Sequence, residues 1–317
     1  RTVHCKSGRT VVYDQLVLST GGDARRLPES VTQNAQVHYL RTLDDATVLR
    51  LAMENKRSLV VIGGGWIGLE VAATARKMGL DVTIVEACER LCVRAAPPQV
   101  STMLYDLHEK HGVKILLNTQ LENLSQADAG NAAISVQLKD GSVLVADVVV
   151  AGIGQSPNVA LALAAKLHVD KGIVVDNQGR SSDPHIFACG DVANQPGHIS
   201  DGRLRLESWA NAQNQAIVVA KAMLGGDDIH AEVPWFWSEQ YYVNLQILGL
   251  SPNDAEVIVR GDIAAGNSTL FFLKDGLLCS AIAINNGRDI KVAKRWMAQK
   301  KIIDIAVFQD VSIPLKP

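Results

Sequence analysis

The 317-residue sequence predicts an α/β fold followed by a smaller α+β module. Between residues 58 and 152, short apolar runs alternate with segments of helical periodicity, and a glycine-rich turn joins the first strand to the first helix. Strands that alternate with helices form βαβ units on a parallel sheet. Consecutive strand-like runs from about Pro234 predict the α+β module, so we place a domain boundary near Val233.

The first elements follow from the local pattern. Residues 1–28 are typical of an extended, hairpin-like start, and residues 41–57 predict a polar-faced helix. An apolar run at 59–62 predicts a strand. A helix then continues to Lys77, and residues 81–86 predict the next strand.

Later elements are predicted in the same way. A helix is expected near residues 98–112, because four apolar side chains recur there at helical spacing: Val100, Met103, Leu104 and Leu107. A strand follows at 113–117, and then a hairpin whose turn lies at residues 139–142. The module after Pro234 ends in a helix near residues 288–301 with a basic outer face. Its predicted buried stripe is Ile290, Ala293, Trp296 and Met297.

The composition is that of an ordinary globular protein, with 47% hydrophobic residues, 20% charged residues and a formal net charge of −2. No apolar run reaches the roughly 20 residues that span a bilayer. Bulk positive charge is also missing, so we expect neither nucleic acid nor a membrane as a partner. The five scattered cysteines form no CxxC pair, which favours a reducing cytoplasm. Because Arg1 begins a stretch typical of mid-domain sequence, we expect the true N-terminus to be missing.

Gly63, Gly65 and Gly68 have the G-x-G-x-x-G spacing of a dinucleotide-binding fingerprint. The first glycine permits the tight turn, the second lets the backbone approach a pyrophosphate, and the third lets the helix pack closely on the strand. The helix N-terminus then faces the phosphates with its free N–H groups. We therefore predict that these glycines bind a cofactor. A glycine turn without a ligand is the alternative.

Two acids accompany this turn. Glu86 ends the next strand, where a carboxylate accepts hydrogen bonds from an adenosine ribose and repels a 2′-phosphate. This favours NAD over NADP, although Arg90 and Arg94 leave the choice open. Glu70 lies just inside the helix among apolar neighbours, and by position alone it fits a carboxylate favoured by the helix dipole.

Two further segments end a buried strand beside glycine. These are "YDQLVLSTGG" (residues 13–22) and "SSDPHIFACGDVA" (residues 181–193). In the second, Asp191 follows Gly190 at the carboxyl end of a strand, which is where open α/β sheets bind ligands. Each segment alone is equally well explained as a structural turn.

Together with the fingerprint, these segments resemble the two-dinucleotide flavoproteins, in which an NAD(P)H domain interrupts an FAD domain. "LVLSTGGDARRLP" resembles the ATG motif of that superfamily, "IFACGDVA" its second FAD motif, and "AGIGQSPN" the glycine turn that closes the NAD domain. "RLESWANAQNQA" and "PWFWSEQYYVNLQILG" are similar to the FAD-dependent NADH:ferredoxin reductases of Rieske-type aromatic-ring dioxygenases and to putidaredoxin and rubredoxin reductases. "RAAPPQV" and "GRDIKVAKRW" look most like reductases of the phenylpropionate dioxygenase kind.

The resemblance covers essentially the whole chain and implies two Rossmann-like domains plus the C-terminal α+β domain. Residues 1–34 and 155–232 would form the FAD domain, residues 35–154 the NAD(H) domain, and residues 233–317 the reductase domain that faces ferredoxin. The family opens with its own G-x-G-x-x-G for FAD, and this sequence has no such segment. We therefore expect a fragment with an incomplete FAD domain, in preference to a chain that cannot bind FAD normally.

The resemblance also implies the chemistry. NADH would reduce FAD at N5, and the reduced flavin would pass single electrons to a [2Fe–2S] ferredoxin of Rieske or plant type. That ferredoxin would serve a dioxygenase of aromatic hydrocarbon catabolism in the cytoplasm. Glu70 would orient the nicotinamide amide, with Gly152 and Gly154 beside the nicotinamide half. The residues implied to contact FAD are Thr20, Gly21, Arg25, Gly190 and Asp191.

The resemblance places two further groups at the flavin. The segment "ESWANAQ" would start a helix whose N–H groups face the flavin pyrimidine edge and stabilise its reduced anion. Trp237 is the candidate beside the isoalloxazine, near the ferredoxin surface. Trp235 shares its face of the strand, so the sequence leaves the choice between them open.

Three other interpretations are compatible with parts of the sequence. An enzyme of the glutathione reductase kind needs a redox cysteine pair at the flavin, but Cys88 and Cys92 follow the acid of the NAD side and are expected to be ordinary thiols. A signalling flavoprotein of apoptosis-inducing-factor type shares the core fold. The third possibility is an inactive truncated fragment. The histidines show no metal-ligand spacing, so no metal site is expected.

Overall fold

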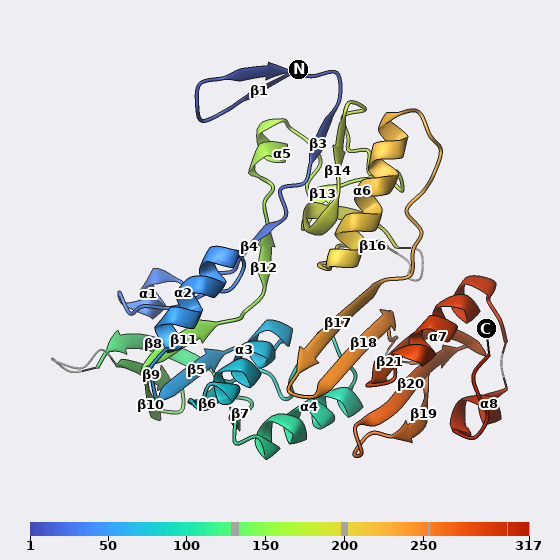
Figure 1. Ribbon diagram of the computed structural model, residues 1–317. Helices are drawn as coiled ribbons and strands as arrows, with labels where there is room; N and C mark the ends of the chain where they lie inside the picture. The colour runs from blue at the N-terminus through green and yellow to red at the C-terminus, as the bar shows by residue number, and fades with distance from the viewer. Residues whose placement is uncertain (128–132, 198–201, 253, 303, 317) are drawn as a thin grey trace.

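The computed structural model describes residues 1–127, 133–197, 202–252, 254–302 and 304–316. For description we divide the chain into a split unit (1–34 and 155–232), a central unit (35–154) and a C-terminal module (233–317). Figure 1 shows most of the split unit above the central unit and the C-terminal module, whereas the short helix at residues 29–32 lies beside the central unit. Strands β4 (Gly22–Ala24) and β12 (Gln155–Pro157) pair antiparallel and connect the split and central units.

The central unit is built on a parallel four-stranded sheet of order β11-β5-β6-β7, as the alternating pattern predicts. Its strands are β5 (Ser58–Ile62), β6 (Asp81–Val85), β7 (Lys114–Leu116) and β11 (Val148–Ala151). Helix α3 (Trp66–Lys77) connects β5 to β6, and α4 (Pro98–Lys110) connects β6 to β7. All four periodic side chains of the helix predicted near residues 98–112 are buried in the core.

Two smaller parts complete the central unit. An antiparallel sheet consists of β8 (Leu121–Gln126), β9 (Ile134–Leu138) and β10 (Val143–Ala146), which include the predicted hairpin. Helix α2 (Leu43–Met53) begins at a capping box formed by Thr42 and Asp45. It is shorter than the predicted 41–57, because the chain leaves helical geometry at Glu54 and Asn55 takes a left-handed φ of 59°.

The split unit consists of short strands and one long helix. A hairpin joins β1 (Thr2–His4) to β2 (Thr10–Val12), as expected, and β3 (Leu16–Leu18) pairs in parallel with β14 (Ile186–Ala188). A second small sheet contains β13 (Ile173–Val174), β15 (Ala193–Pro196) and β16 (Arg203–Leu204). The helices are α1 (Glu29–Thr32), α5 (Ala160–Ala164), the 3₁₀ turn η1 (Gly190–Val192) and α6 (Trp209–Met223).

The C-terminal module is an antiparallel five-stranded sheet of order β17-β18-β21-β20-β19. Its strands are β17 (Trp235–Gln240), β18 (Val243–Gly249), β19 (Glu256–Asp262), β20 (Asn267–Lys274) and β21 (Leu277–Ile284). Helix α7 (Gly287–Gln299) packs on β21 and β18, and α8 (Ile305–Gln309) packs on β19. Ile290, Ala293 and Trp296 of the predicted stripe are buried and Met297 is half-buried.

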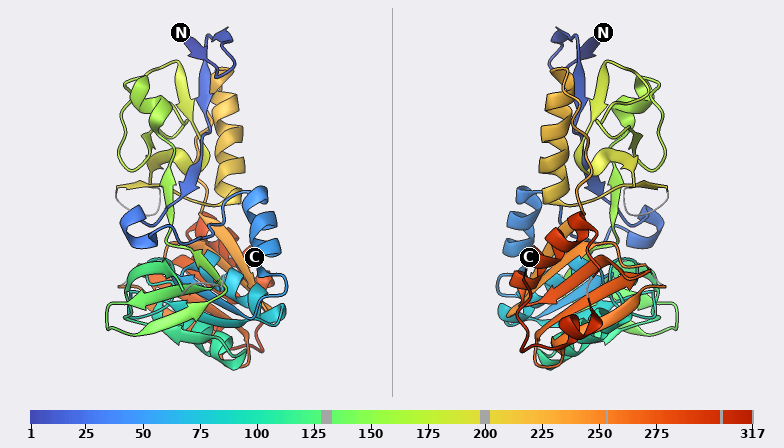
Figure 2. Two further views of the ribbon diagram at one scale, coloured as in Figure 1. Left: turned by 90° about the vertical axis from the view of Figure 1, so that its left-hand side faces the viewer. Right: turned by 90° about the vertical axis from the view of Figure 1, so that its right-hand side faces the viewer.

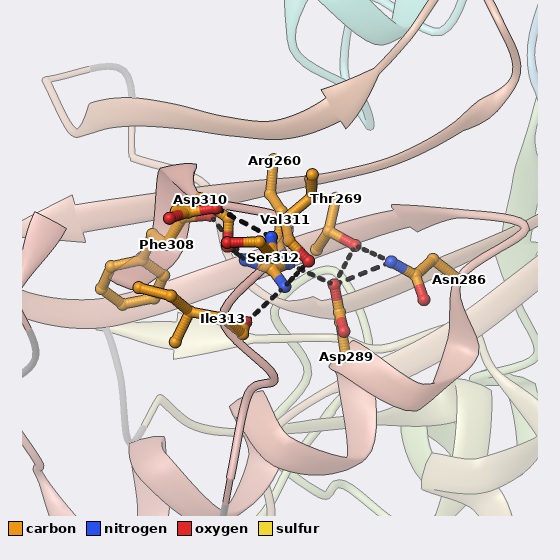
Figure 3. Close-up of polar contacts among 9 residues, drawn as sticks. All are labelled: Arg260, Thr269, Asn286, Asp289, Phe308, Asp310, Val311, Ser312 and Ile313. Carbon is orange, nitrogen blue, oxygen red and sulfur yellow. Dashed lines mark hydrogen bonds and ion pairs between the residues drawn. The ribbon is translucent and has the colours of Figure 1, made fainter. Parts of the chain in front are cut away.

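A buried arginine ties the end of the chain to this sheet (Figure 3). The guanidinium of Arg260 donates hydrogen bonds to four backbone carbonyls: those of Phe308, Asp310, Val311 and Ile313. Its Nε lies 3.7 Å from Oδ2 of Asp289, which also accepts hydrogen bonds from Thr269 and Asn286. Asp289, the one acid of the basic α7 segment, therefore faces inward.

The central unit and the C-terminal module share one hydrophobic core. The same cluster contains Val61 and Leu104 of the central unit and Leu245 and Ile282 of the C-terminal sheet. Helix α3 packs against β17, and both side views in Figure 2 show the C-terminal sheet set against the central unit. Within the described part of the chain, no helix has the length and apolar composition needed to cross a bilayer.

Candidate functional site

The glycine turn after β5 has room for a ligand at one glycine only. A Cβ on Gly63 would lie 2.6 Å from the carbonyl oxygen of Gly152, and a Cβ on Gly68 would lie 2.1 Å from that of Gly63. Both approaches are too close for any side chain, and Gly63 also has a φ of 104°. At Gly65 the space is open, and no side chain caps the start of α3 there. The free N–H groups at this helix start therefore fit a diphosphate.

Glu86 lies directly beside the turn. Its Oε2 accepts a hydrogen bond from the Gly64 N–H at 2.5 Å, and its Oε1 accepts one from the Cys88 N–H at 2.7 Å. The guanidinium of Arg90 donates hydrogen bonds to the Ala96 carbonyl and to Ser101 Oγ. The carboxylate is thus the charged group fixed at the edge of the turn.

Two glycines after β11 complete this side of the site. Gly152 packs against the start of α3, where a Cβ would lie 3.3 Å from the Gly68 nitrogen. Gly154 has a φ of 107°, and its carbonyl accepts a hydrogen bond from the Arg25 N–H at 2.9 Å. Arg25 therefore lies where the split unit meets the central unit, and its side chain is exposed.

A second group of predicted residues meets in the split unit. Because β3 and β14 are parallel, their carboxyl ends lie at the same edge, and the residues that follow them come together there: Thr20, Gly21, Gly190 and Asp191. Gly21 and Gly190 have φ values of 59° and 76°. Oδ2 of Asp191 accepts hydrogen bonds from Arg41 at 3.2 Å and from Gln155 at 3.1 Å. This strand edge, with two left-handed glycines and an oriented carboxylate, fits one half of a dinucleotide site.

Arg41 and Gln155 were missed from the sequence. Arg41 belongs to no recognised motif, and the resemblance of "AGIGQSPN" implied no contact of Gln155 with Asp191; the two residues lie 150 and 36 positions from Asp191 along the chain. Only the folding of β4 and β12 brings them to the carboxylate.

Aromatic side chains meet where α6 approaches β17. The predicted helix in "ESWANAQ" begins at Trp209, with Ser208 as its N-cap. The rings of Trp209 and Trp237 lie 6.4 Å apart edge to face, and those of Trp235 and Trp237 are stacked 5.1 Å apart. Trp235 packs against the core of the C-terminal module, whereas Trp237 is 42% exposed. Of the two candidates, Trp237 is the more exposed.

Glu70 has a partner that the helix position did not indicate. Its Oε1 accepts a hydrogen bond of 2.5 Å from Oγ of Ser238, which is on β17 of the C-terminal module. Burial raises the pKa of Glu70, the hydrogen bond from Ser238 opposes the rise, and the negative charge of Glu239 adds to it. Alternation along the strand predicts that Phe236, Ser238 and Gln240 share one face. It does not predict that Ser238 contacts Glu70.

The cysteines take no part in a dithiol site. All five are free, including Cys88 and Cys92, which lie beside the glycine turn. Burial raises the pKa of Cys92 to about 12, so its thiol is unreactive at neutral pH. Among the residues that the structure describes, no group of three or more acidic, histidine or cysteine side chains could hold a metal ion.

A glycine-turn βαβ unit set into a second α/β unit defines the class of dinucleotide-dependent oxidoreductases. The chain belongs to the pyridine nucleotide-disulphide oxidoreductase family, which matches residues 1–216, and residues 235–317 match the reductase C-terminal domain. It is accordingly an oxidoreductase that uses FAD and NAD(H).

Individual relatives agree with this assignment. The chain is 43% identical over 315 residues to the ferredoxin–NAD(+) reductase component of an anthranilate 1,2-dioxygenase system of Burkholderia cepacia, covering 99% of this chain and 77% of the relative. It is 38% identical to putidaredoxin reductase of Pseudomonas putida, covering 98% of this chain and 74% of the relative. It resembles the crystal structure of a covalent putidaredoxin reductase–putidaredoxin complex with a TM-score of 0.92 and 37% identity, covering 99% of this chain and 76% of that one.

Proposed function

We propose that the protein is a ferredoxin–NAD(+) reductase, which passes electrons from NADH through FAD to a [2Fe–2S] ferredoxin. The observation that carries the proposal is the 43% identity to a dioxygenase-system reductase over 99% of the chain. We further propose that the ferredoxin, of Rieske or plant type, serves an aromatic-ring-hydroxylating dioxygenase in the cytoplasm. FAD, when bound, accepts two electrons together and releases them singly, which a nicotinamide cannot do.

The central unit is proposed to bind NADH. The open space at Gly65 and the uncapped start of α3 support placing the diphosphate there, with Gly63 and Gly68 shaping the turn. Glu86 would accept hydrogen bonds from the adenosine ribose. Gly152 and Gly154 would lie beside the nicotinamide half, and Glu70 would orient the carboxamide. Residues 35–154 thereby act as the NAD(H) domain.

The split unit is proposed to bind FAD through Thr20, Gly21, Arg25, Gly190 and Asp191. The oriented carboxylate of Asp191 supports a contact with the ribityl chain. Trp237 is proposed to lie beside the isoalloxazine, because it is exposed next to Trp209 at the start of α6. Residues 1–34 and 155–232 thereby act as the FAD domain, and residues 233–317 as the domain that meets ferredoxin.

The test uses the purified protein with its flavin. NADH should bleach the flavin absorbance, and a [2Fe–2S] ferredoxin should accelerate steady-state NADH oxidation. A small dye acceptor such as ferricyanide serves as the control for the NADH half-reaction. Equal turnover with glutathione disulfide and with ferredoxin would contradict the proposal.

A further inference from the structure

A chain of four hydrogen-bonded groups begins at Glu70 and crosses from the central unit to the C-terminal module. Ser238 Oγ lies 2.5 Å from Glu70 Oε1, Gln240 Nε2 lies 3.0 Å from Ser238 Oγ, and His108 Nε2 lies 2.8 Å from Gln240 Oε1. Ser238 and Gln240 are each 2% exposed and His108 is 0% exposed, so water does not compete for these bonds.

When Glu70 is ionised, its carboxylate determines every proton position among these four groups. A carboxylate only accepts hydrogen bonds, so Ser238 must donate its single proton to Glu70. The oxygen of Ser238 is then left as an acceptor for the amide N–H of Gln240. The amide oxygen of Gln240 consequently faces His108, which must carry its proton on Nε2. Every donor therefore points toward Glu70.

The His108 end of this series of hydrogen bonds is held in place by packing. Tyr241 follows β17 and places its hydroxyl 3.5 Å from Nδ1 of His108, the ring nitrogen that this scheme leaves unprotonated. The ring of Tyr241 is stacked on His111 at 3.7 Å, and its carbonyl accepts a hydrogen bond from Lys77. Burial lowers the pKa of His108, which agrees with a neutral ring.

We propose that Ser238, Gln240 and His108 are positioning residues for Glu70: they hold its carboxylate ionised and in one orientation, so that its second oxygen meets the nicotinamide carboxamide. The last clause rests on the proposed function, whereas the direction of the hydrogen bonds does not. The C-terminal module thus completes the NADH site as well as meeting ferredoxin.

The direction of these hydrogen bonds is tested without any cofactor. Nitrogen NMR of protein labelled at histidine should show His108 neutral and protonated on Nε2 between about pH 5 and pH 8. His111, Tyr241 and Gln240 are the groups that face this ring. A proton on Nδ1, or a doubly protonated ring at pH 7, would overturn the proposal.

The effect on Glu70 is tested by a double-mutant cycle on NADH affinity, measured by equilibrium titration. Ser238→Ala should raise the Kd for NADH about tenfold, because a hydrogen bond to a charged group is lost. In a Glu70→Ala background the same substitution should change Kd less than twofold, since its action requires the carboxylate. Additive losses would show that Ser238 acts on NADH independently of Glu70 and would overturn the proposal.

Two further measurements separate the possible failures. Carboxyl NMR should show that Ser238→Ala raises the pKa of Glu70, whose other titratable neighbours are Glu239 on β17 and the neutral thiol of Cys92. An unchanged pKa would overturn the positioning role. If Glu70→Ala alone leaves NADH affinity unchanged while this pKa shift is found, the proposed nicotinamide contact fails and the hydrogen-bonded chain stands. Glu239→Gln on the same strand should move the pKa of Glu70 in the opposite direction, because it removes a negative charge that raises this pKa.

Discussion

Glu86 accepts hydrogen bonds from two backbone N–H groups, one on each carboxylate oxygen. The first belongs to Gly64 in the glycine turn after β5, and the second belongs to Cys88 in the loop after β6. Charge-assisted bonds of this kind fix both the loop and the carboxylate. A rigid negative charge at the edge of the glycine turn would repel the extra phosphate of NADPH, and ribose hydroxyls could still approach it. One residue therefore combines a structural role with the proposed choice of cofactor.

Glu86→Gln separates these two roles, because the amide retains an oxygen that can accept from the Gly64 N–H. We expect the affinity for NADH to fall several-fold and its advantage over NADPH to narrow, as the repulsion of the 2′-phosphate is lost. Titration with both nucleotides measures the ratio. Glu89→Gln, an exposed acid in the same loop, should leave it unchanged. An unaltered ratio in Glu86→Gln would exclude Glu86 as the selecting residue.

At the scale of elements, helix α7 sorts its residues by face. Ile290, Ala293 and Trp296 are buried, and so is Asp289, through its contacts with Arg260, Thr269 and Asn286. The outer face carries Arg288, Lys291, Lys294 and Arg295. Lys294 lies 3.6 Å from Glu232, whereas no described acid pairs with Lys291 or Arg295. Lys291 and Arg295 line a cavity of about 650 Å³ that opens to the surface.

If an acidic ferredoxin approaches this face, Lys291→Glu combined with Arg295→Glu should slow ferredoxin reduction about tenfold or more at low salt. The difference should shrink as salt shortens the Debye length. Stopped-flow rates over a salt series measure the effect. Lys6→Glu with Arg9→Glu makes the same charge change in the hairpin at the far end of the molecule (Figure 1) and should have little effect. Equal slowing by both pairs would point to net charge and not to docking on α7.

At the scale of the whole molecule, the central unit and the C-terminal module share one core, and the half-buried carboxylate of Glu70 lies at its border. The rings of Trp66 and Phe236 meet edge to face at 5.4 Å beside Glu70 and Ser238. Since the folded chain raises the pKa of Glu70, it binds that proton more tightly than the unfolded chain does. The associated stability is present below the ordinary carboxyl pKa of about 4.3 and is lost as pH rises through the raised pKa.

Glu70→Gln removes this charge and keeps an acceptor for Ser238. The free energy of unfolding should therefore increase at pH 7, and the gain should disappear at about pH 3, below the ordinary carboxyl pKa, where Glu70 is protonated in both states. Urea unfolding at the two pH values measures the difference. Glu239→Gln, exposed on the same strand, should give a smaller change at pH 7. A gain of equal size at both pH values would rule out the desolvated charge as its cause.

The elements were largely predictable because each depends on neighbours in the sequence. The periodicity of Val100, Met103, Leu104 and Leu107 is a property of one helix, and the structure confirms it. The end of α2 was misplaced, because the left-handed turn at Asn55 has no strong signal in a polar segment. The inward side chain of Asp289 on α7 has no local signal either, since its partner Arg260 lies on strand β19.

The sequence by itself determined the α/β class, the glycine turn with its acid, and the family, because these depend on spacing within short segments. Only the tertiary structure decided the partners of the charged groups. Ser238 is 168 positions from Glu70, and Arg41 is 150 positions from Asp191. It also shows that Trp237 is more exposed than Trp235, a difference that alternation along a strand does not reveal. Contacts between distant segments depend on how sheets and helices pack, and no local pattern encodes which side chains then meet.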